Sequence, residues 1–167
     1  MTGHKVDLLV VGAGPVGLYG AYYAGVRGLS TAIIDSLSEV GGQVSALYPE
    51  KMIFDIAGYP AVKGRDLVEA LLTQASAHRP QFLLGQEAQN LRTDSAGRFQ
   101  VETSSGDSID CGAVVVTGGI GTFTPRQLPA GEIYLGRGLD YFVPDPAPYT
   151  GADVVVVGGG DSALDWA

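Results

Sequence analysis

Short apolar runs and a helical segment alternate at the start of the chain. The runs VDLLVV at 6–11 and TAII at 31–34 each predict a strand buried on both faces, which is typical of parallel sheets. Between them, residues 15–26 predict a helix that ends before Gly28. Together the three segments predict a strand–helix–strand unit.

The hydrophobic period changes in the middle of the chain. Residues 36–59 have no clear period and predict a long loop, which in a compact domain calls for a functional explanation. Apolar residues on one face predict an amphipathic helix over 65–77. An antiparallel meander is predicted from short runs separated by turn residues, at 81–84, 88–92, 99–103 and 108–111. Buried parallel strands are predicted again at 114–117 and 153–157, on either side of a proline-rich connection.

Two glycine groups follow predicted strands and precede predicted helices. The first glycine motif, residues 12–17, reads G-x-G-x-x-G. Gly12 permits the tight turn, Gly14 lets the backbone approach a pyrophosphate, and Gly17 lets the helix pack on the strand. Asp35 ends the second strand, where a carboxylate is expected to accept the ribose hydroxyls. The combination predicts a dinucleotide site.

The second glycine motif, residues 158–163, follows VVVV and reads G-x-G-x-x-A. Two such turns in one chain predict two nucleotides, such as a tightly held flavin and a mobile nicotinamide. A strand–turn–helix corner without a ligand is the alternative interpretation. The residue that selects NAD or NADP is expected beyond Ala167.

Composition and charge exclude several classes of protein. Glycine makes up 25 of 167 residues without a three-residue period, and the charged share is only 17%, so collagen-like and disordered chains are excluded. The net charge of −8 is concentrated after residue 84 and argues against nucleic acid as a partner. No apolar run is long enough for a membrane span and no signal-peptide pattern is present, so a cytoplasmic protein is expected. One cysteine and two histidines argue against an internal disulfide, a redox CxxC pair and a metal site.

Five longer segments together make the chain recognisable. They are VDLLVVGAGPVGLYGAYYAGVRGLSTAIID, GGQVSALYPEKMIFDIAGYP, VVVTGGIGTFTPR, GRGLDYFV and VVVVGGGDSALDWA. Their resemblance is to ferredoxin–NADP(+) reductases of the thioredoxin-reductase-like type, and it covers essentially the whole chain, in order. It implies a doubly wound, Rossmann-like α/β FAD-binding domain at 1–117 that contains a three-stranded meander. A connection at 118–150 and the first strand, turn and helix of an NADPH domain at 151–167 are implied to follow.

The resemblance also implies roles for individual residues. Gly42 and Gln43 would approach the flavin, Tyr48 would stack on its ring, and Asp55 would lie near the ring. Ordinary turn or packing roles are the alternatives for these four positions. The full FAD set implied is Gly12, Gly14, Pro15, Gly17, Asp35, Gly42, Gln43, Tyr48, Asp55, Ala88 and Gly118. The implied NADPH set is Gly158, Gly160, Asp161 and Ala163.

One departure separates this chain from thioredoxin reductases. Their redox CxxC follows a G-R-G segment, whereas residues 139–145 here, after Gly136-Arg137-Gly138, contain no cysteine. The implied function is therefore an FAD oxidoreductase that takes hydride from NADPH and passes electrons to ferredoxin or flavodoxin. No side chain is expected to act as an essential catalytic base. A homodimer is expected for the full-length enzyme. A thioredoxin-reductase-like protein and a non-catalytic FAD-binding fragment are the alternatives, because the chain is expected to be the N-terminal part of a longer reductase.

Overall fold

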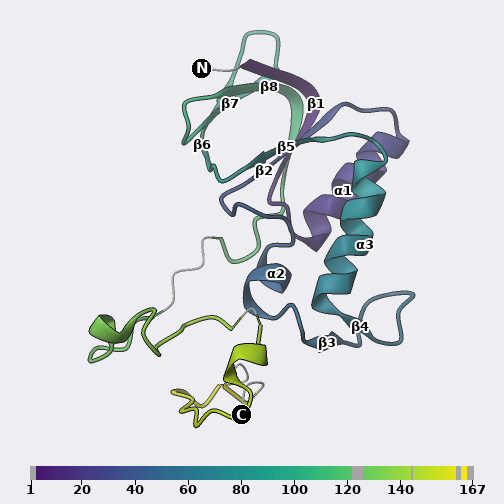
Figure 1. Ribbon diagram of the computed structural model, residues 1–167. Coiled ribbons are helices and arrows are strands. Elements are labelled where there is room, and N and C mark those ends of the chain that lie inside the picture. Colours follow the sequence, from purple (N-terminus) through teal and green to yellow (C-terminus); the bar gives the residue numbers. More distant parts are fainter. Residues whose placement is uncertain (1–2, 122–125, 144, 161–162, 165–167) are drawn as a thin grey trace.

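A six-stranded sheet with helices against one face organises the computed structural model, which describes residues 3–121, 126–143, 145–160 and 163–164 (Figure 1). The strand order is β5-β2-β1-β8-β7-β6. The strands of this sheet are β1 (Gly3–Val11), β2 (Thr31–Asp35), β5 (Gln81–Leu84), β6 (Ala88–Thr93), β7 (Phe99–Thr103) and β8 (Ser108–Val116). The other elements are α1 (Pro15–Val26), α2 (Gln43–Leu47), β3 (Met52–Ile53), β4 (Val62–Lys63), α3 (Gly64–Ser76), η1 (Glu132–Tyr134) and η2 (Ala147–Tyr149).

Strand β8 joins the parallel and antiparallel parts of this sheet. It runs parallel to β1, with Cys111 opposite Val6, and antiparallel to β7, with Cys111 also opposite Phe99. The sequence predicts two strands here, at 108–111 and 114–117, and that division is wrong. Gly112 interrupts the apolar pattern because a side chain would crowd β1: a Cβ atom there would lie 3.0 Å from the carbonyl oxygen of Asp7.

Strand β5 also differs from the prediction. The sequence assigns 81–84 to the meander, but β5 pairs parallel with β2, so that Asp35 lies opposite Leu84. A strand that follows a crossover helix such as α3 can return parallel to the strand before it. A four-residue apolar run does not contain the information that selects its partner.

One face of the sheet is covered by α1 and α3, which lie side by side (Figure 1). The buried side chains between helices and sheet include Val10, Leu18, Ile33, Val68 and Ala75. Both helices match the predicted segments to within about one residue. Within the described ranges, no helix combines the length and apolar character needed to cross a membrane.

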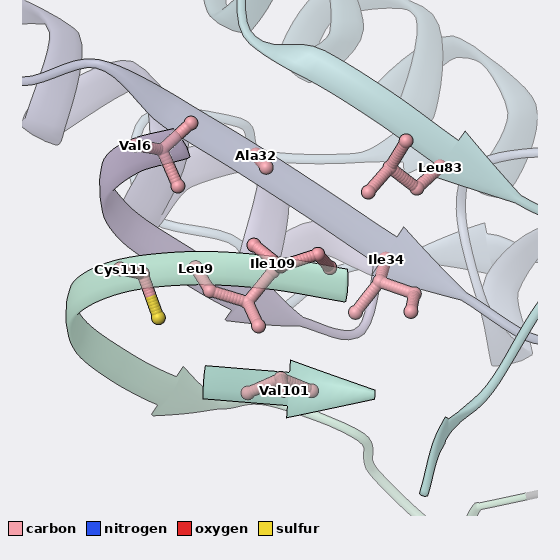
Figure 2. Close-up of a cluster of buried hydrophobic side chains, with 8 residues drawn as sticks. All are labelled: Val6, Leu9, Ala32, Ile34, Leu83, Val101, Ile109 and Cys111. Carbon is pink, nitrogen blue, oxygen red and sulfur yellow. The ribbon is translucent and has the colours of Figure 1, made fainter. Parts of the chain in front are cut away.

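The opposite face is covered by the meander itself, because β7 and the first half of β8 curl over the parallel strands. Figure 2 shows the resulting cluster, the meander-side core, in which side chains of β1, β2 and β5 meet those of β7 and β8. Its members are Val6, Leu9, Ala32, Ile34, Leu83, Val101, Ile109 and Cys111. Consecutive residues such as Leu9 and Val10 therefore point into different cores, as strand geometry requires.

The predicted strand at 153–157 is wrong. These residues pair with no strand, and the side chains of Val154–Val157 are between 39% and 86% exposed. A strand needs a neighbour that bonds its backbone N–H and C=O groups, and none of the described residues supplies one here. The apolar run therefore predicts a strand that only a further sheet would stabilise.

Ile109 is fully buried in the meander-side core. We expect Ile109→Ala to lower the free energy of unfolding by about 2–5 kcal/mol, because a cavity forms in a packed core. Leu91→Ala is the matched control, since Leu91 on neighbouring β6 is 58% exposed and its loss should cost less than about 0.5 kcal/mol. Urea unfolding followed by circular dichroism measures both. Equal losses would contradict the assigned core.

Cys111 lies in the same cluster, with no exposed surface. Burial raises the pKa of its thiol above the ordinary value, so the reactive thiolate is scarce at neutral pH. We expect native protein to react with a chromogenic disulfide reagent far more slowly than protein unfolded in guanidinium, which should release one thiol equivalent per chain. Rapid reaction of the native protein would show that the thiol is accessible.

Candidate functional site

The first glycine motif forms a tight turn between β1 and α1, held against the end of β8. Gly12 has a φ of +113°, and a Cβ atom there would lie 2.6 Å from the carbonyl oxygen of Thr117. At Gly17 a Cβ atom would collide with the carbonyl oxygen of Gly12 and lie 2.9 Å from Oγ1 of Thr117. That hydroxyl donates to the carbonyl oxygens of Val11 and Gly12. Both glycines are therefore required by the packing of the protein itself.

Gly14 serves a different purpose. Its backbone is extended (φ −70°, ψ −179°), a conformation that any residue adopts. A Cβ atom there would have one neighbour within 4 Å, the Cα atom of Gly42 at 4.0 Å. Gly14 lines an open cavity and caps α1, so an anion placed there would meet backbone N–H groups and the positive end of the helix dipole. The missing side chain leaves room for a ligand.

Asp35 lies beside this turn, at the end of β2. Its Oδ2 accepts a hydrogen bond of 2.6 Å from the backbone N–H of Ala13, and its Oδ1 accepts one of 2.9 Å from the N–H of Leu37. The carboxylate thus connects the first glycine motif to the loop after β2. Sequence reasoning assigns Asp35 to the ribose and gives no sign of these backbone contacts.

The Gly41-Gly42-Gln43 segment packs on the other side of the turn. Gly41 donates its N–H to the carbonyl oxygen of Ala13 at 2.9 Å, and both glycines have positive φ values. Gln43 begins α2, a short helix inside the stretch that the sequence predicts as a loop. Nε2 of Gln43 lies 2.9 Å from where a Cβ atom of Gly119 would be, so the amide reaches the loop after β8.

A cavity of about 520 Å³, the first cavity, opens where these segments meet. Its volume lies within the range of ligand pockets, about 300–1,000 Å³. It lies beyond the carboxyl ends of the parallel strands, where α/β sheets bind their ligands. The predicted residues that it brings together are Gly12, Gly14, Pro15, Asp35, Gly42, Gln43, Tyr48, Ala88 and Gly118.

A second cavity of about 550 Å³ adjoins the first. The two share Pro15, Val44 and Tyr48 in their walls. Asp55 lines the second cavity and is exposed there, so the structure places it apart from the first cavity. Two adjoining cavities with shared walls suit an elongated ligand with two parts. Gly17 lines neither, in agreement with its packing role.

Several residues that line the first cavity were not identified from the sequence. They include Val16, Ser36, Leu37, Gln86 and Glu87. Four of them follow the carboxyl ends of β2 or β5, which is the signal that could have identified them. The link between these two strand ends is direct, because Gln86 donates its N–H to the carbonyl oxygen of Asp35 at 3.1 Å.

The described residues of the second glycine motif, 158–160 and 163, line neither cavity. Gly158 has a φ of +141°, and the carbonyl oxygen of Gly160 accepts the N–H groups of Ala163 and Leu164, which form a helical turn. Asp161 falls outside the described residues. Neither described cavity is lined by this motif, so the structure does not bring the two glycine motifs together.

Comparison with known proteins shows that the chain is similar to oxidoreductases named for pyridine nucleotides. The family model "Pyridine nucleotide-disulphide oxidoreductase" matches residues 6–167. The ferredoxin–NADP reductase of Salinispora tropica is 57% identical over 164 residues, which are 98% of this chain and 51% of that protein. The ferredoxin–NADP reductase of Saccharopolyspora erythraea is 58% identical over 98% of this chain and 50% of its own length. The chain thus spans about half the length of these relatives.

A solved structure agrees with the sequence comparison. The crystal structure of T. acidophilum thioredoxin reductase superimposes with a TM-score of 0.63 at 26% identity, covering 81% of this chain and 42% of that one. The predicted α/β dinucleotide-binding fold is thereby confirmed. Together with the match of the family model over nearly the entire sequence, the glycine turn and its cavity show that this chain belongs to the pyridine nucleotide-disulphide oxidoreductase family.

Proposed function

We propose that the chain forms the FAD-binding part of a reductase that takes hydride from NADPH and passes electrons to ferredoxin or flavodoxin. The observation that carries this proposal is the cavity at Gly14, where the protein leaves open the space that a Cβ atom would fill. The relatives named ferredoxin–NADP reductases support the reaction and the electron carrier. When bound, a flavin supplies the hydride acceptor and the one-electron donor that amino-acid side chains lack.

The first cavity fits the adenosine diphosphate half of FAD. The Gly12–Gly17 turn offers N–H groups for the pyrophosphate. Asp35 stands next to it at the ribose end, and Gln86 and Ala88 form the wall left for the adenine. Because the backbone N–H of Glu87 donates to Oγ of Ser104 at 2.9 Å, the hairpin between β7 and β8 supports that wall.

The second cavity fits the flavin half. Tyr48 stands between the two cavities and presents an aromatic ring that a flat conjugated system can contact. Gly42 and Gln43 lie on the path between the pyrophosphate and the ring, and Asp55 lies on the far wall. These residues bind and orient the cofactor, and none is assigned as a catalytic base.

The second glycine motif is proposed as the start of the NADPH site, through Gly158, Gly160, Asp161 and Ala163. The proposed domain limits remain 1–117, 118–150 and 151–167. We also propose that the complete enzyme is a homodimer and that it is located in the cytoplasm.

Reduction of thioredoxin is the second candidate, favoured by the thioredoxin reductase neighbour. Disulfide exchange needs a pair of thiols. This chain has a single cysteine, and Cys111 is buried in the meander-side core and lines neither described cavity. A non-catalytic FAD-binding protein is the third candidate, favoured by the unpaired segment at 153–157.

We expect Gly14→Val to fold normally and to lose bound flavin, because the new side chain fills the pyrophosphate position without disturbing a packed contact. Gly20→Val, within the helix that Gly14 caps, is the matched control, since a Cβ atom there meets nothing within 4 Å. Absorbance of the purified proteins and chromatography of the released cofactor measure the flavin content. A Gly14→Val protein that keeps its full flavin content would refute the placement of the pyrophosphate.

We expect the 167-residue chain to bind FAD but to oxidise NADPH no faster than free flavin does, because the second glycine motif lines neither described cavity. Joining the chain to the region of the Salinispora tropica reductase that lies outside the match should restore NADPH oxidation with ferredoxin as acceptor. A yellow chimera that remains inactive with ferredoxin and flavodoxin would contradict the proposed acceptor. Rapid NADPH oxidation by the chain alone would contradict the expected requirement for a further region.

A further inference from the structure

Helix α3 begins without a capping side chain, since Lys63 occupies the capping position and its side chain makes no cap hydrogen bond. The first N–H groups of a helix have no acceptor within the helix and need another partner. The N–H of Gly64 donates to the carbonyl oxygen of Lys51 at 3.0 Å. The N–H of Arg65 donates to the carbonyl oxygen of Pro49 at 2.8 Å. These two carbonyl groups therefore cap the helix.

The capping segment, residues 49–51, directly follows Tyr48 and lies against Gly64 at the start of the helix. A Cβ atom on Gly64 would lie 2.7 Å from the carbonyl oxygen of Tyr48 and 3.1 Å from that of Pro49. It would also lie 2.9 Å from Cγ1 of Val44. The helix can approach the segment this closely only because Gly64 has no side chain.

Tyr48 lies between two helices and also lines both cavities. Its N–H donates to the carbonyl oxygen of Val44 in α2 at 3.4 Å, and its carbonyl group faces Gly64 at the start of α3. Figure 1 shows α2 beside that end of α3, and the two helices are in contact. Because a side chain occupies only a few rotamers on a given backbone, the fixed backbone of Tyr48 limits where its ring can lie.

We infer that the start of α3 positions the aromatic ring of Tyr48, with Gly64 as the positioning residue. This inference rests on the proposed function, in which that ring contacts the flavin. In Gly64→Ala the new methyl group would displace the carbonyl groups of Tyr48 and Pro49, which belong to the main chain and cannot rotate aside as the end of a flexible side chain can. The ring would move with its backbone. The first glycine motif, held by the hydroxyl of Thr117, would keep its place.

Ion pairs also connect the capping segment to the start of α3. The Glu50 carboxylate pairs with Lys63 at 3.4 Å and with Arg65. The side chains of both cations are about half exposed, at 48% and 56%. Ion pairs that are open to water contribute little to stability. Glu50→Gln removes the charge and keeps the shape, so it is a matched control within the capping segment.

The fluorescence of bound FAD reports the position of the ring, because an aromatic side chain stacked on a flavin quenches its emission. We expect both Tyr48→Leu and Gly64→Ala to raise this fluorescence several-fold. Glu50→Gln and Gly20→Ala are the controls and should keep the wild-type value. Gly20→Ala is the same chemical change at a position where a Cβ atom meets nothing within 4 Å.

Isothermal titration separates the ring from the rest of the site. FAD should bind Gly64→Ala about 2- to 10-fold more weakly than the wild-type chain, the range that an aromatic pair contributes, whereas ADP, which has no flavin, should bind with unchanged affinity. Equal weakening of both ligands, or wild-type fluorescence in Gly64→Ala, would overturn the inference. If Tyr48→Leu leaves the fluorescence unchanged, the proposed placement of the flavin is wrong and the inference falls with it. A wild-type chain that binds neither ligand would refute the proposed function itself.

Backbone hydrogen exchange tests the cap in the wild-type chain without any ligand. Arg65 is the second residue of α3, and Val16 is the second residue of α1. Val16 is the matched control, because none of the described residues accepts its N–H. After correction for intrinsic rates, we expect the amide of Arg65 to exchange at least about tenfold more slowly than that of Val16, and this difference to shrink in Gly64→Ala. Equal rates in the wild-type chain would overturn the inference, even if Gly64→Ala does not fold.

Discussion

The contact between the first glycine motif and the end of β8 determines where the first cavity lies. Gly12 and Gly17 can approach Thr117 only because neither carries a Cβ atom, and the Thr117 hydroxyl bonds the carbonyl oxygens at the end of β1. This approach brings the N-terminus of α1 to the carboxyl edge of the sheet. Once the turn is fixed there, the space beside Gly14 stays open for a ligand, because Gly14 has no side chain.

Strand β8 positions that contact because it pairs with both the parallel and the antiparallel part of the sheet. Its parallel pairing with β1 brings Thr117 to the turn, and its antiparallel pairing with β7 folds the meander over the face that the helices leave open. The same strand therefore closes the meander-side core and supports the cavity. A sheet whose second face is covered by its own strands needs no helix there.

The segment after residue 150, unlike β8, has no strand partner among the described residues. Its valines and glycines have the pattern of another strand and phosphate turn, yet the described residues there are exposed and unpaired. Backbone groups of a parallel strand are satisfied only by neighbouring strands, so the pattern alone does not produce the element. Relatives about twice as long as this chain have further sequence that could provide such neighbours.

Local patterns in the sequence determined the elements near the first glycine motif. Hydrophobic periodicity predicted α1, α3, β1 and β2. The steric demands of a tight turn gave Gly12, Gly14 and Gly17 separate predicted roles. Nine of the twenty residues that line the first cavity are among those predicted from the motif and the resemblance. Only the tertiary structure decided that β5 joins β2, that β8 is one strand, that Gln86 and Glu87 reach the cavity, and that the Asp35 carboxylate bonds Ala13. The physical reason is that strand pairing and hydrogen bonds between backbone and carboxylate groups connect residues far apart in the chain. The periodicity within one segment does not indicate which distant group will complete the hydrogen bonds of that segment.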